Sequence, residues 1–181
     1  MKKFLVLYLF LGTSIIGWSQ DISNPVQPST ELKINAFNLI AFTFIDVSYE
    51  RLLNEESSLG LGLLFNVAEN NEILDEFRSF SLTPYYRQYF SNQYAKGFFL
   101  EGFGMVNSGN EADYYADFEM TQLIKGEAYT AFALGISVGG KFVTPRGFAV
   151  EIYTGLGRNL FGSDISPDIV SRGGVSLGFR F

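Results

Sequence analysis

Cysteine and histidine are both absent from this sequence of 181 residues, and the two absences exclude much of familiar enzyme chemistry. A chain without cysteine forms no disulfide framework, thiol nucleophile or thiolate metal site, and it carries no lipidated N-terminal cysteine. A chain without histidine lacks the commonest general base, the commonest zinc ligand and any Ser-His-Asp arrangement. Catalysis by paired carboxylates, or by serine with lysine, is still compatible with the composition.

Basic residues are outnumbered: Lys and Arg total 13 against 19 Asp and Glu, which gives a net charge of −6. Loss of Lys2 and Lys3 with an N-terminal leader would leave 11 basic residues and a net charge of −8. Because such a chain is repelled by a phosphate backbone, we expect no nucleic-acid partner. The 19 Phe, 10 Tyr and 19 Gly residues favour strands over helices, and the length suits one domain.

The first 19 residues have the organisation of a secretory signal peptide. Residues 1–3 carry two lysines, residues 4–16 are mostly apolar, and residues 17–19 place small side chains where signal peptidase requires them. We expect cleavage after Ser19 or after Gln20. The apolar stretch is shorter than the ~20 residues of a membrane-spanning helix, which argues against a membrane anchor.

Beyond a proline-containing lead-in at residues 20–30, the domain at 31–181 is dominated by alternation of apolar with polar or small residues. A period of two marks β-strands with two different faces. Several runs reach about ten residues, the length of a tilted strand that crosses a bilayer. The pattern predicts about eight strands, near residues 31–40, 43–53, 58–67, 78–90, 97–107, 127–140, 147–158 and 171–181.

The connections between these strands alternate in length. The short ones are residues 54–57, 91–96 and 141–146, and the longer, more charged ones are residues 68–77, 108–126 and 159–170. Short turns at one end and long loops at the other are typical of outer-membrane barrels. We therefore predict an all-β fold, a closed up-and-down antiparallel barrel. The short apolar link at 40–43 is the exception, since it falls where a long loop is expected.

The faces of the strands differ in a way that favours a membrane barrel over a soluble one. Bulky apolar residues line one face, whereas the other carries about one charge per strand among Gly, Ser, Ala and Tyr. A solvent-facing surface would need several charges per strand. The sparse charges suit a narrow, filled interior, where they are tolerated only as ion pairs. The predicted interior network is Lys33, Glu50, Arg87, Glu101, Glu151 and Arg180, with the three glutamates paired to Arg87, Arg180 and Lys33.

Other interpretations of these residues have less support. The glutamates have no visible nucleophile or metal partner, so a catalytic role is disfavoured. The glycines of residues 135–140 lie within an alternating strand with no helix after it, so they do not form a phosphate-binding loop. An aromatic cluster near the second short turn suits a girdle at the level of lipid headgroups, with core packing in a soluble barrel as the alternative. It comprises Tyr85, Tyr86, Tyr89, Phe90, Tyr94, Phe98 and Phe99.

The C-terminal run from Gly174 to Phe181, with the leader and the strand count, resembles the small outer-membrane β-barrels typified by OmpA-barrel and OmpX-like proteins. Residues 32–35, 47–50 and 86–90 also resemble an uncharacterised group of such barrels common in Bacteroidetes-type bacteria. The resemblance implies an outer-membrane location and a C-terminal signal for the barrel-assembly machinery. That signal would be formed by Val175, Leu177, Phe179 and Phe181.

The expected function is a non-enzymatic barrel with acidic extracellular loops and a structural or surface-interaction role in the cell envelope. Its expected partners are outer-membrane lipids and, during biogenesis, the barrel-assembly machinery, and we expect no cofactor and no metal site. The acidic loops 68–77 and 108–126 are taken as solvated, with divalent cations bridging them to lipid phosphates as the sharper hypothesis. The main alternative is a lipocalin-like or lipid-pocket barrel that binds a small apolar ligand. An open pore is disfavoured because side chains fill an eight-stranded barrel.

Overall fold

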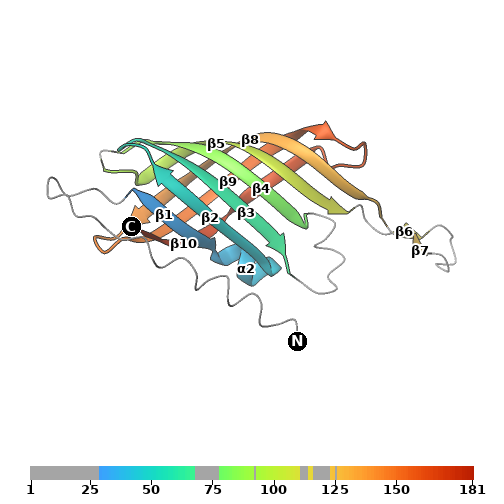
Figure 1. Ribbon diagram of the computed structural model, residues 1–181, viewed down its shortest axis with the longest axis horizontal. Coiled ribbons are helices and arrows are strands. Elements are labelled where there is room, and N and C mark those ends of the chain that lie inside the picture. The colour runs from blue at the N-terminus through green and yellow to red at the C-terminus, as the bar shows by residue number, and fades with distance from the viewer. Residues whose placement is uncertain (1–28, 68–77, 92, 111–113, 116–122, 125) are drawn as a thin grey trace, which may run out of the picture.

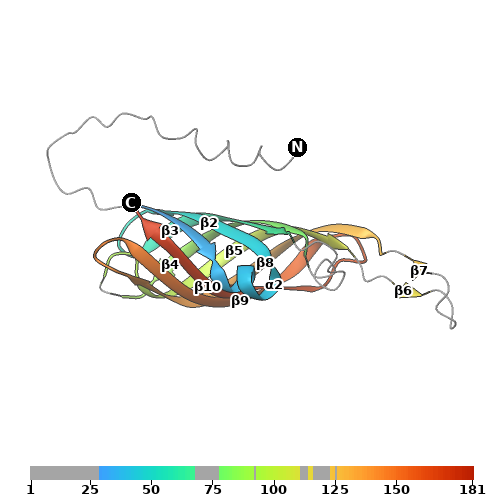
Figure 2. The same cartoon turned by 90° about the horizontal axis from the view of Figure 1, so that it is seen from below.

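The computed structural model of the chain describes residues 29–67, 78–91, 93–110, 114–115, 123–124 and 126–181. Eight strands of this part close into one antiparallel barrel in the order β1-β10-β9-β8-β5-β4-β3-β2 (Figures 1 and 2). The barrel strands are β1 (Thr30–Asn35), β2 (Phe44–Leu52), β3 (Ser57–Asn66), β4 (Phe80–Tyr89), β5 (Gly97–Asn110), β8 (Ala128–Val143), β9 (Phe148–Gly162) and β10 (Ile169–Arg180). The all-β, up-and-down fold predicted from the alternation is therefore confirmed.

Three smaller elements complete the described chain. The helix α2 (Ala36–Phe42) links β1 to β2, and β6 (Tyr114–Tyr115) pairs with β7 (Leu123–Ile124) in a separate two-stranded sheet. No helix among the described residues is long and apolar enough to cross a membrane. The expected signal peptide and most of the acidic loops lie outside the described residues.

The two ends of the barrel are unlike each other. At one end, here called the turn end, the strands are joined by residues 53–56, 90–96 and 144–147. The first strand begins there and the chain ends there, since Thr30 and Phe181 exchange backbone hydrogen bonds (Figure 1). At the other end, here called the loop end, the connections are residues 67–79, 111–127 and 163–168. The last of these is shorter than predicted, because β9 and β10 both extend further toward the loop end.

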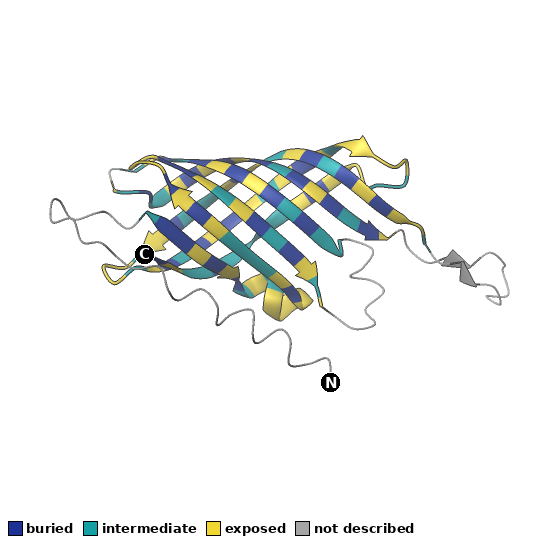
Figure 3. Ribbon diagram, in the orientation of Figure 1, coloured by how far each residue is buried: buried dark blue, intermediate teal, exposed yellow. Residues whose placement is uncertain are grey.

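Exposure alternates along most of the barrel wall, as the chequered colouring of Figure 3 shows. The apolar side chains point out: Ile136 is 65% exposed and Ile152 is 58% exposed. The charged residues between them point in: Glu101 is 0% exposed and Glu151 is 1% exposed. The fold therefore buries these charged side chains and exposes the bulky apolar ones, the reverse of a soluble barrel.

One predicted strand ends early. Residues 36–40 were expected to continue the first strand, but they form the first part of α2. Asn35 caps this helix, since its side-chain oxygen accepts a hydrogen bond from the Asn38 backbone N–H at 3.2 Å. Thr43 ends it in the left-handed conformation. The apolar run looked like a strand because helix and strand cannot be distinguished by hydrophobicity alone over so few residues.

The predicted aromatic girdle is only partly outward-facing. Tyr86, Phe90 and Phe98 point out and are about half exposed. Tyr85, Tyr89 and Phe99 instead point into the barrel and are buried, and Tyr94 is half-buried beside them. The prediction of an outward girdle was wrong for these three rings because side chains alternate between the two faces of a strand. Two residues whose positions differ by an odd number therefore point to opposite faces.

Candidate functional site

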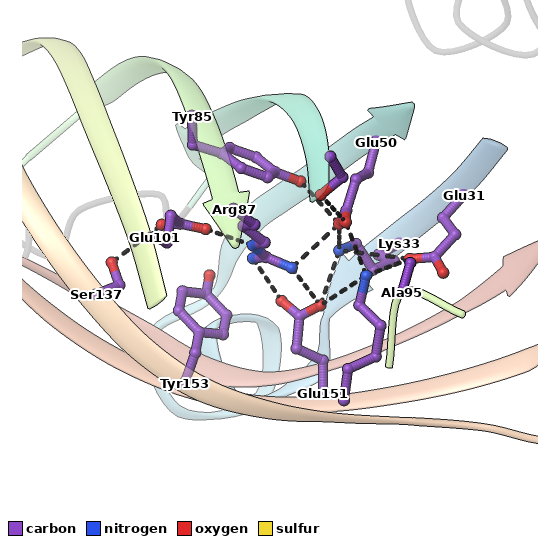
Figure 4. A network of polar contacts seen from close by, with 12 residues as sticks. Glu31, Lys33, Glu50, Tyr85, Arg87, Ala95, Glu101, Ser137, Glu151 and Tyr153 are labelled. Atoms are coloured by element: carbon purple, nitrogen blue, oxygen red, sulfur yellow. Dashed lines mark hydrogen bonds and ion pairs between the residues drawn. The ribbon is translucent and has the colours of Figure 1, made fainter. Parts of the chain in front are cut away.

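The interior contains two regions of different chemistry, one near the turn end and one near the loop end. The region near the turn end is a buried network of ion pairs (Figure 4). We call it the charge cluster, and it consists of Glu31, Lys33, Glu50, Arg87, Glu101, Lys141, Glu151, Arg172 and Arg180.

Arg87 lies at the centre of the charge cluster and contacts three glutamates (Figure 4). Its Nε donates to Glu101 at 2.6 Å, and its two Nη atoms donate to the two oxygens of Glu151 at 2.6 and 2.7 Å. One Nη also donates to Glu50 at 3.0 Å. The guanidinium carbon lies 4.3 Å from the ring centroid of Phe99, so the cation is packed as well as paired.

Two lysines supply the remaining charge at the centre. Lys33 binds Glu50, and it donates to Glu151 at 2.8 Å. Lys141 donates to Glu31 at 2.7 Å and to Glu50 at 2.8 Å. The two lysines and their three glutamate partners are almost completely buried. Their desolvation is offset because each carboxylate contacts more than one cation.

Neutral groups complete the coordination of the glutamates. The Ser58 hydroxyl donates to Glu50 at 2.6 Å, the Tyr89 hydroxyl donates to Glu50, and the Ser137 hydroxyl donates to Glu101 at 3.0 Å. Across the described chain, one buried side-chain polar atom has no partner, the Asn107 Oδ1. Every buried carboxylate oxygen of the charge cluster therefore has a hydrogen-bond partner.

All six residues predicted for the interior network lie in the charge cluster, and five of them form one connected set of ion pairs: Lys33, Glu50, Arg87, Glu101 and Glu151. Arg180 binds Glu31 at 2.6 Å and the carbonyl oxygens of Tyr94 and Ala95, and it contacts none of the three predicted glutamates.

Three members of the charge cluster were missed, although the sequence contained a signal for each. Glu31 is two residues before Lys33 and therefore shares its face, and Arg172 has the same parity as Arg180 on β10. Lys141 lies one residue beyond the predicted end of its strand, which the structure continues to Val143.

The four residues of the expected assembly signal lie on the outward side of β10 and at the C-terminus. Val175 and Leu177 are partly exposed, Phe179 is 51% exposed and Phe181 is 61% exposed. Their outward position leaves them accessible to lipid or to another protein.

The second interior region, near the loop end, is a cavity of about 860 Å³. This volume lies within the roughly 300–1,000 Å³ of pockets that hold drug-sized ligands. Its inner wall includes the buried apolar side chains of Phe44, Leu64, Met105 and Val170. We call this space the loop-end cavity.

Three charged residues line the loop-end cavity. Asp46 accepts hydrogen bonds from the side-chain amides of Asn35 and Asn38 at 2.9 and 2.7 Å. Arg172 binds Glu101 at the boundary with the charge cluster. Arg78 donates to the Ser171 carbonyl oxygen at 2.5 Å and to the Met105 sulfur at 3.3 Å. Among the described residues no group of three or more His, Cys, Asp or Glu could hold a metal ion.

The comparisons with known proteins give a family without a function. Residues 5–164 match the family described as protein of unknown function (DUF3575), a stretch that takes in every barrel strand except β10. No curated protein and no solved structure matches the chain.

Proposed function

The chain belongs to the DUF3575 family of proteins of unknown function, and we propose that it is a non-enzymatic β-barrel of a bacterial outer membrane. Its role would be structural or would involve surface interactions of the cell envelope. The observation that carries the proposal is the arrangement of the two strand faces, with an apolar outer surface around a charged, closed interior.

The outer surface has the chemistry that a bilayer requires. Every barrel strand exposes at least one large apolar side chain, and Ile136, Ile152 and Leu156 are each more than half exposed. Contiguous apolar surface on this scale is rare on soluble monomers, which carry charges for solubility. A bilayer removes that surface from water, and a closed barrel leaves no unpaired strand edge facing lipid where its wall is complete.

The expected processing and assembly fit this location. Residues 1–19 have the sequence features of a signal peptide, and residues 174–181 alternate apolar with small or polar residues and include Phe179 and Phe181. This run resembles the last strand of OmpA-barrel and OmpX-like proteins. We propose outer-membrane lipids as lasting partners and the barrel-assembly machinery as a transient one.

The interior supports a non-enzymatic role. The carboxylates of the charge cluster are held by cations and hydroxyl groups, which stabilise the ionised form and make each carboxylate a weaker proton acceptor. The same cluster spans the interior near the turn end with ion pairs between opposite strands, which opposes steady conduction.

A lipocalin-like carrier is the second candidate, and one observation favours its ligand-binding role. The loop-end cavity is large enough for a ligand. The exposed apolar surface opposes a soluble carrier, so a ligand role is compatible with the proposal only for a barrel embedded in lipid.

Cell fractionation followed by electrophoresis tests the location. The processed protein should be recovered from the outer-membrane fraction and should migrate differently before and after boiling, because a closed barrel resists the detergent until it is heated. Recovery from a detergent-free periplasmic or secreted fraction would overturn the proposal.

A matched pair of variants tests the outer surface directly. Ile136→Arg places a charge in the middle of β8, and in a bilayer it should cost about 2–4 kcal/mol of stability. Gln93→Arg places the same charge at the exposed turn end, where the expected cost is near zero. Equal stability of the two variants in vesicles would contradict a membrane-facing surface.

A further inference from the structure

The barrel wall is incomplete near the loop end. β1 has six residues and pairs with β2 and β10 only over Thr30–Asn35. Beyond it, residues 44–46 of β2 pair with β3 alone, and residues 169–175 of β10 pair with β9 alone. Two strand edges therefore face each other there with no strand between them.

The helix α2 occupies this gap and contacts both β2 and β10 (Figures 1 and 2). Asn35 anchors its start, since the Asn35 amide donates to the carbonyl oxygen of Gly173 at 3.1 Å. The helix carries no charge and has no buried residue, and Ile40 is 84% exposed. An apolar helix of seven residues thus covers an opening between two strand edges.

The loop-end cavity lies directly behind this opening. Phe37 and Phe42 of α2 line it from the gap, together with Gly173 and Gly174 of the facing edge. Its deeper wall is the apolar set of Phe44, Leu64, Met105 and Val170. The cavity therefore extends from an apolar interior to the place where the wall lacks a strand.

The charges of the cavity favour an anion. No carboxylate of the described residues lies within 4.0 Å of Arg78, which contacts a carbonyl oxygen and a thioether sulfur. Burial lowers the pKa of the Arg78 guanidinium, and the nearby positive charge of Arg172 lowers it further, against the opposite influence of Tyr129 and Asp46. An anion bound here would relieve this unfavourable environment.

The described interior as a whole has more cations than carboxylates. Five carboxylates, Glu31, Asp46, Glu50, Glu101 and Glu151, face six cations, Lys33, Arg78, Arg87, Lys141, Arg172 and Arg180. The excess of one positive charge is notable in a chain whose net charge is −6. Arg78 is the cation of this set without a carboxylate partner among the described residues.

We propose that the loop-end cavity binds a single-chain amphipathic carboxylate of the fatty-acid type. Its carboxylate would lie against Arg78 and Arg172, and its hydrocarbon chain along Phe44, Leu64 and Met105. It would enter from the bilayer between β2 and β10, past α2. The cavity volume favours one hydrocarbon chain over a two-chain lipid. The entry route rests on the proposed membrane location, whereas the binding site does not.

A pair of tryptophan reporters tests the site in the full chain. Trp18 is the one tryptophan of the sequence and lies in the expected signal peptide, so the processed chain, or Trp18→Phe where the leader is retained, provides a background without tryptophan fluorescence. Phe44→Trp then reports from the cavity wall, and Phe65→Trp reports from the outward face of the neighbouring strand. Each protein is reconstituted in phosphatidylcholine vesicles, and heat-dependent mobility verifies that it has folded.

The probe is ω-bromoundecanoic acid, whose bromine quenches tryptophan on contact. We expect saturable quenching of the Phe44→Trp reporter and a linear, unsaturated response of the Phe65→Trp reporter, which senses only partition into the bilayer. Arg78→Gln should weaken binding of the acid at least about tenfold, because a charge-assisted hydrogen bond is lost. Arg78→Lys should retain more of the affinity, and Arg146→Gln, at an exposed turn position, should have no effect.

The corresponding bromoalcohol separates the carboxylate from the chain. The alcohol should bind more weakly, and Arg78→Gln should leave its binding unchanged. Non-saturable quenching at Phe44→Trp, or equal binding of acid and alcohol in both backgrounds, would overturn the proposal.

A brominated phosphatidylcholine distinguishes failure of the site from failure of the membrane location. If it quenches Phe65→Trp but the acid does not saturate at Phe44→Trp, the site is wrong and the location stands. If it does not quench Phe65→Trp, the location is wrong, and the same acid titration without vesicles tests the cavity alone.

Discussion

The two halves of the barrel interior are built on the same strands but filled in opposite ways. Near the turn end, the inward positions carry charges that bind one another across the interior. Near the loop end, the inward positions of the same strands carry Phe44, Leu64, Met105 and Val170, and a cavity of about 860 Å³ remains. The alternation that places these residues inside is identical in both halves.

The difference shows that alternation determines which side chains are inside but not what they do there. Charged side chains in a dry interior need partners, so they converge and close the space. Apolar side chains need no partner, so they can line a space that stays open to a ligand. Stability and binding are thus divided between the two halves.

The largest effect is expected at the centre of the charge cluster. Arg87→Ala removes the cation shared by Glu50, Glu101 and Glu151, and it should destabilise the protein by about 3–5 kcal/mol. Urea unfolding in detergent micelles, followed by the heat-modifiable band, measures this cost. The control Arg146→Ala, at an exposed turn position, should change stability by no more than about 0.5 kcal/mol. An unchanged midpoint for Arg87→Ala would show that the guanidinium is solvated.

The next effect is expected in the apolar half. Met105 is 1% exposed and packs in a cluster with Tyr85, Phe103 and Val170. Met105→Ala should cost about 2 kcal/mol, the low end for such truncations, because the residue already borders a cavity. The same urea titration measures it. A loss as large as that of Arg87→Ala would mean that the two halves contribute equally to stability.

A smaller effect is expected at the junction of the two halves. Gly174 has a φ of +144°, and a Cβ added there would lie against the Asn35 amide that anchors α2. Gly174→Ala should therefore cost about 1–2 kcal/mol. Gly140 is the matched control, because an added Cβ there meets no atom within 4 Å. Equal stability of the two alanine variants would show that the junction adapts without strain.

The smallest effect on stability is expected at the cation of the loop-end cavity. Arg78→Gln breaks no ion pair of the described chain and loses contacts with the Ser171 carbonyl oxygen and the Met105 sulfur. It should cost about 1 kcal/mol, far less than the loss of Arg87. A cost of 3 kcal/mol or more would place Arg78 with the charge cluster, as a structural rather than a binding cation.

The fold could be predicted because its determinants are local. The period of two identified the barrel strands, and the lengths of the connections separated the two ends. The strand predicted for residues 36–40 was wrong because the signal for α2 is a single capping side chain, Asn35. The run after Asn35 contains no glycine or proline that would separate it from the strand.

The candidate sites were predictable to different degrees. Parity along a strand predicts which charges face inward, and it would also have found Glu31 and Arg172 had it been applied to every charged residue. Parity cannot predict which charges pair. Arg180 binds Glu31 because the register of β1 against β10 places the two residues opposite each other, and this register is not visible in the sequence. The loop-end cavity was not predicted at all, since an unfilled volume depends on the shapes of side chains from many strands.

The charge cluster also constrains how the protein folds. All eight barrel strands contribute to it, β3 through the Ser58 hydroxyl. Some of its contacts join residues very far apart in the chain, 118 positions for Lys33 with Glu151 and 149 for Arg180 with Glu31. An open sheet with some strands missing would hold desolvated charges without their counterions. Closure should therefore be a single cooperative event with a high contact order, slow to reach and without stable half-formed barrels on the way.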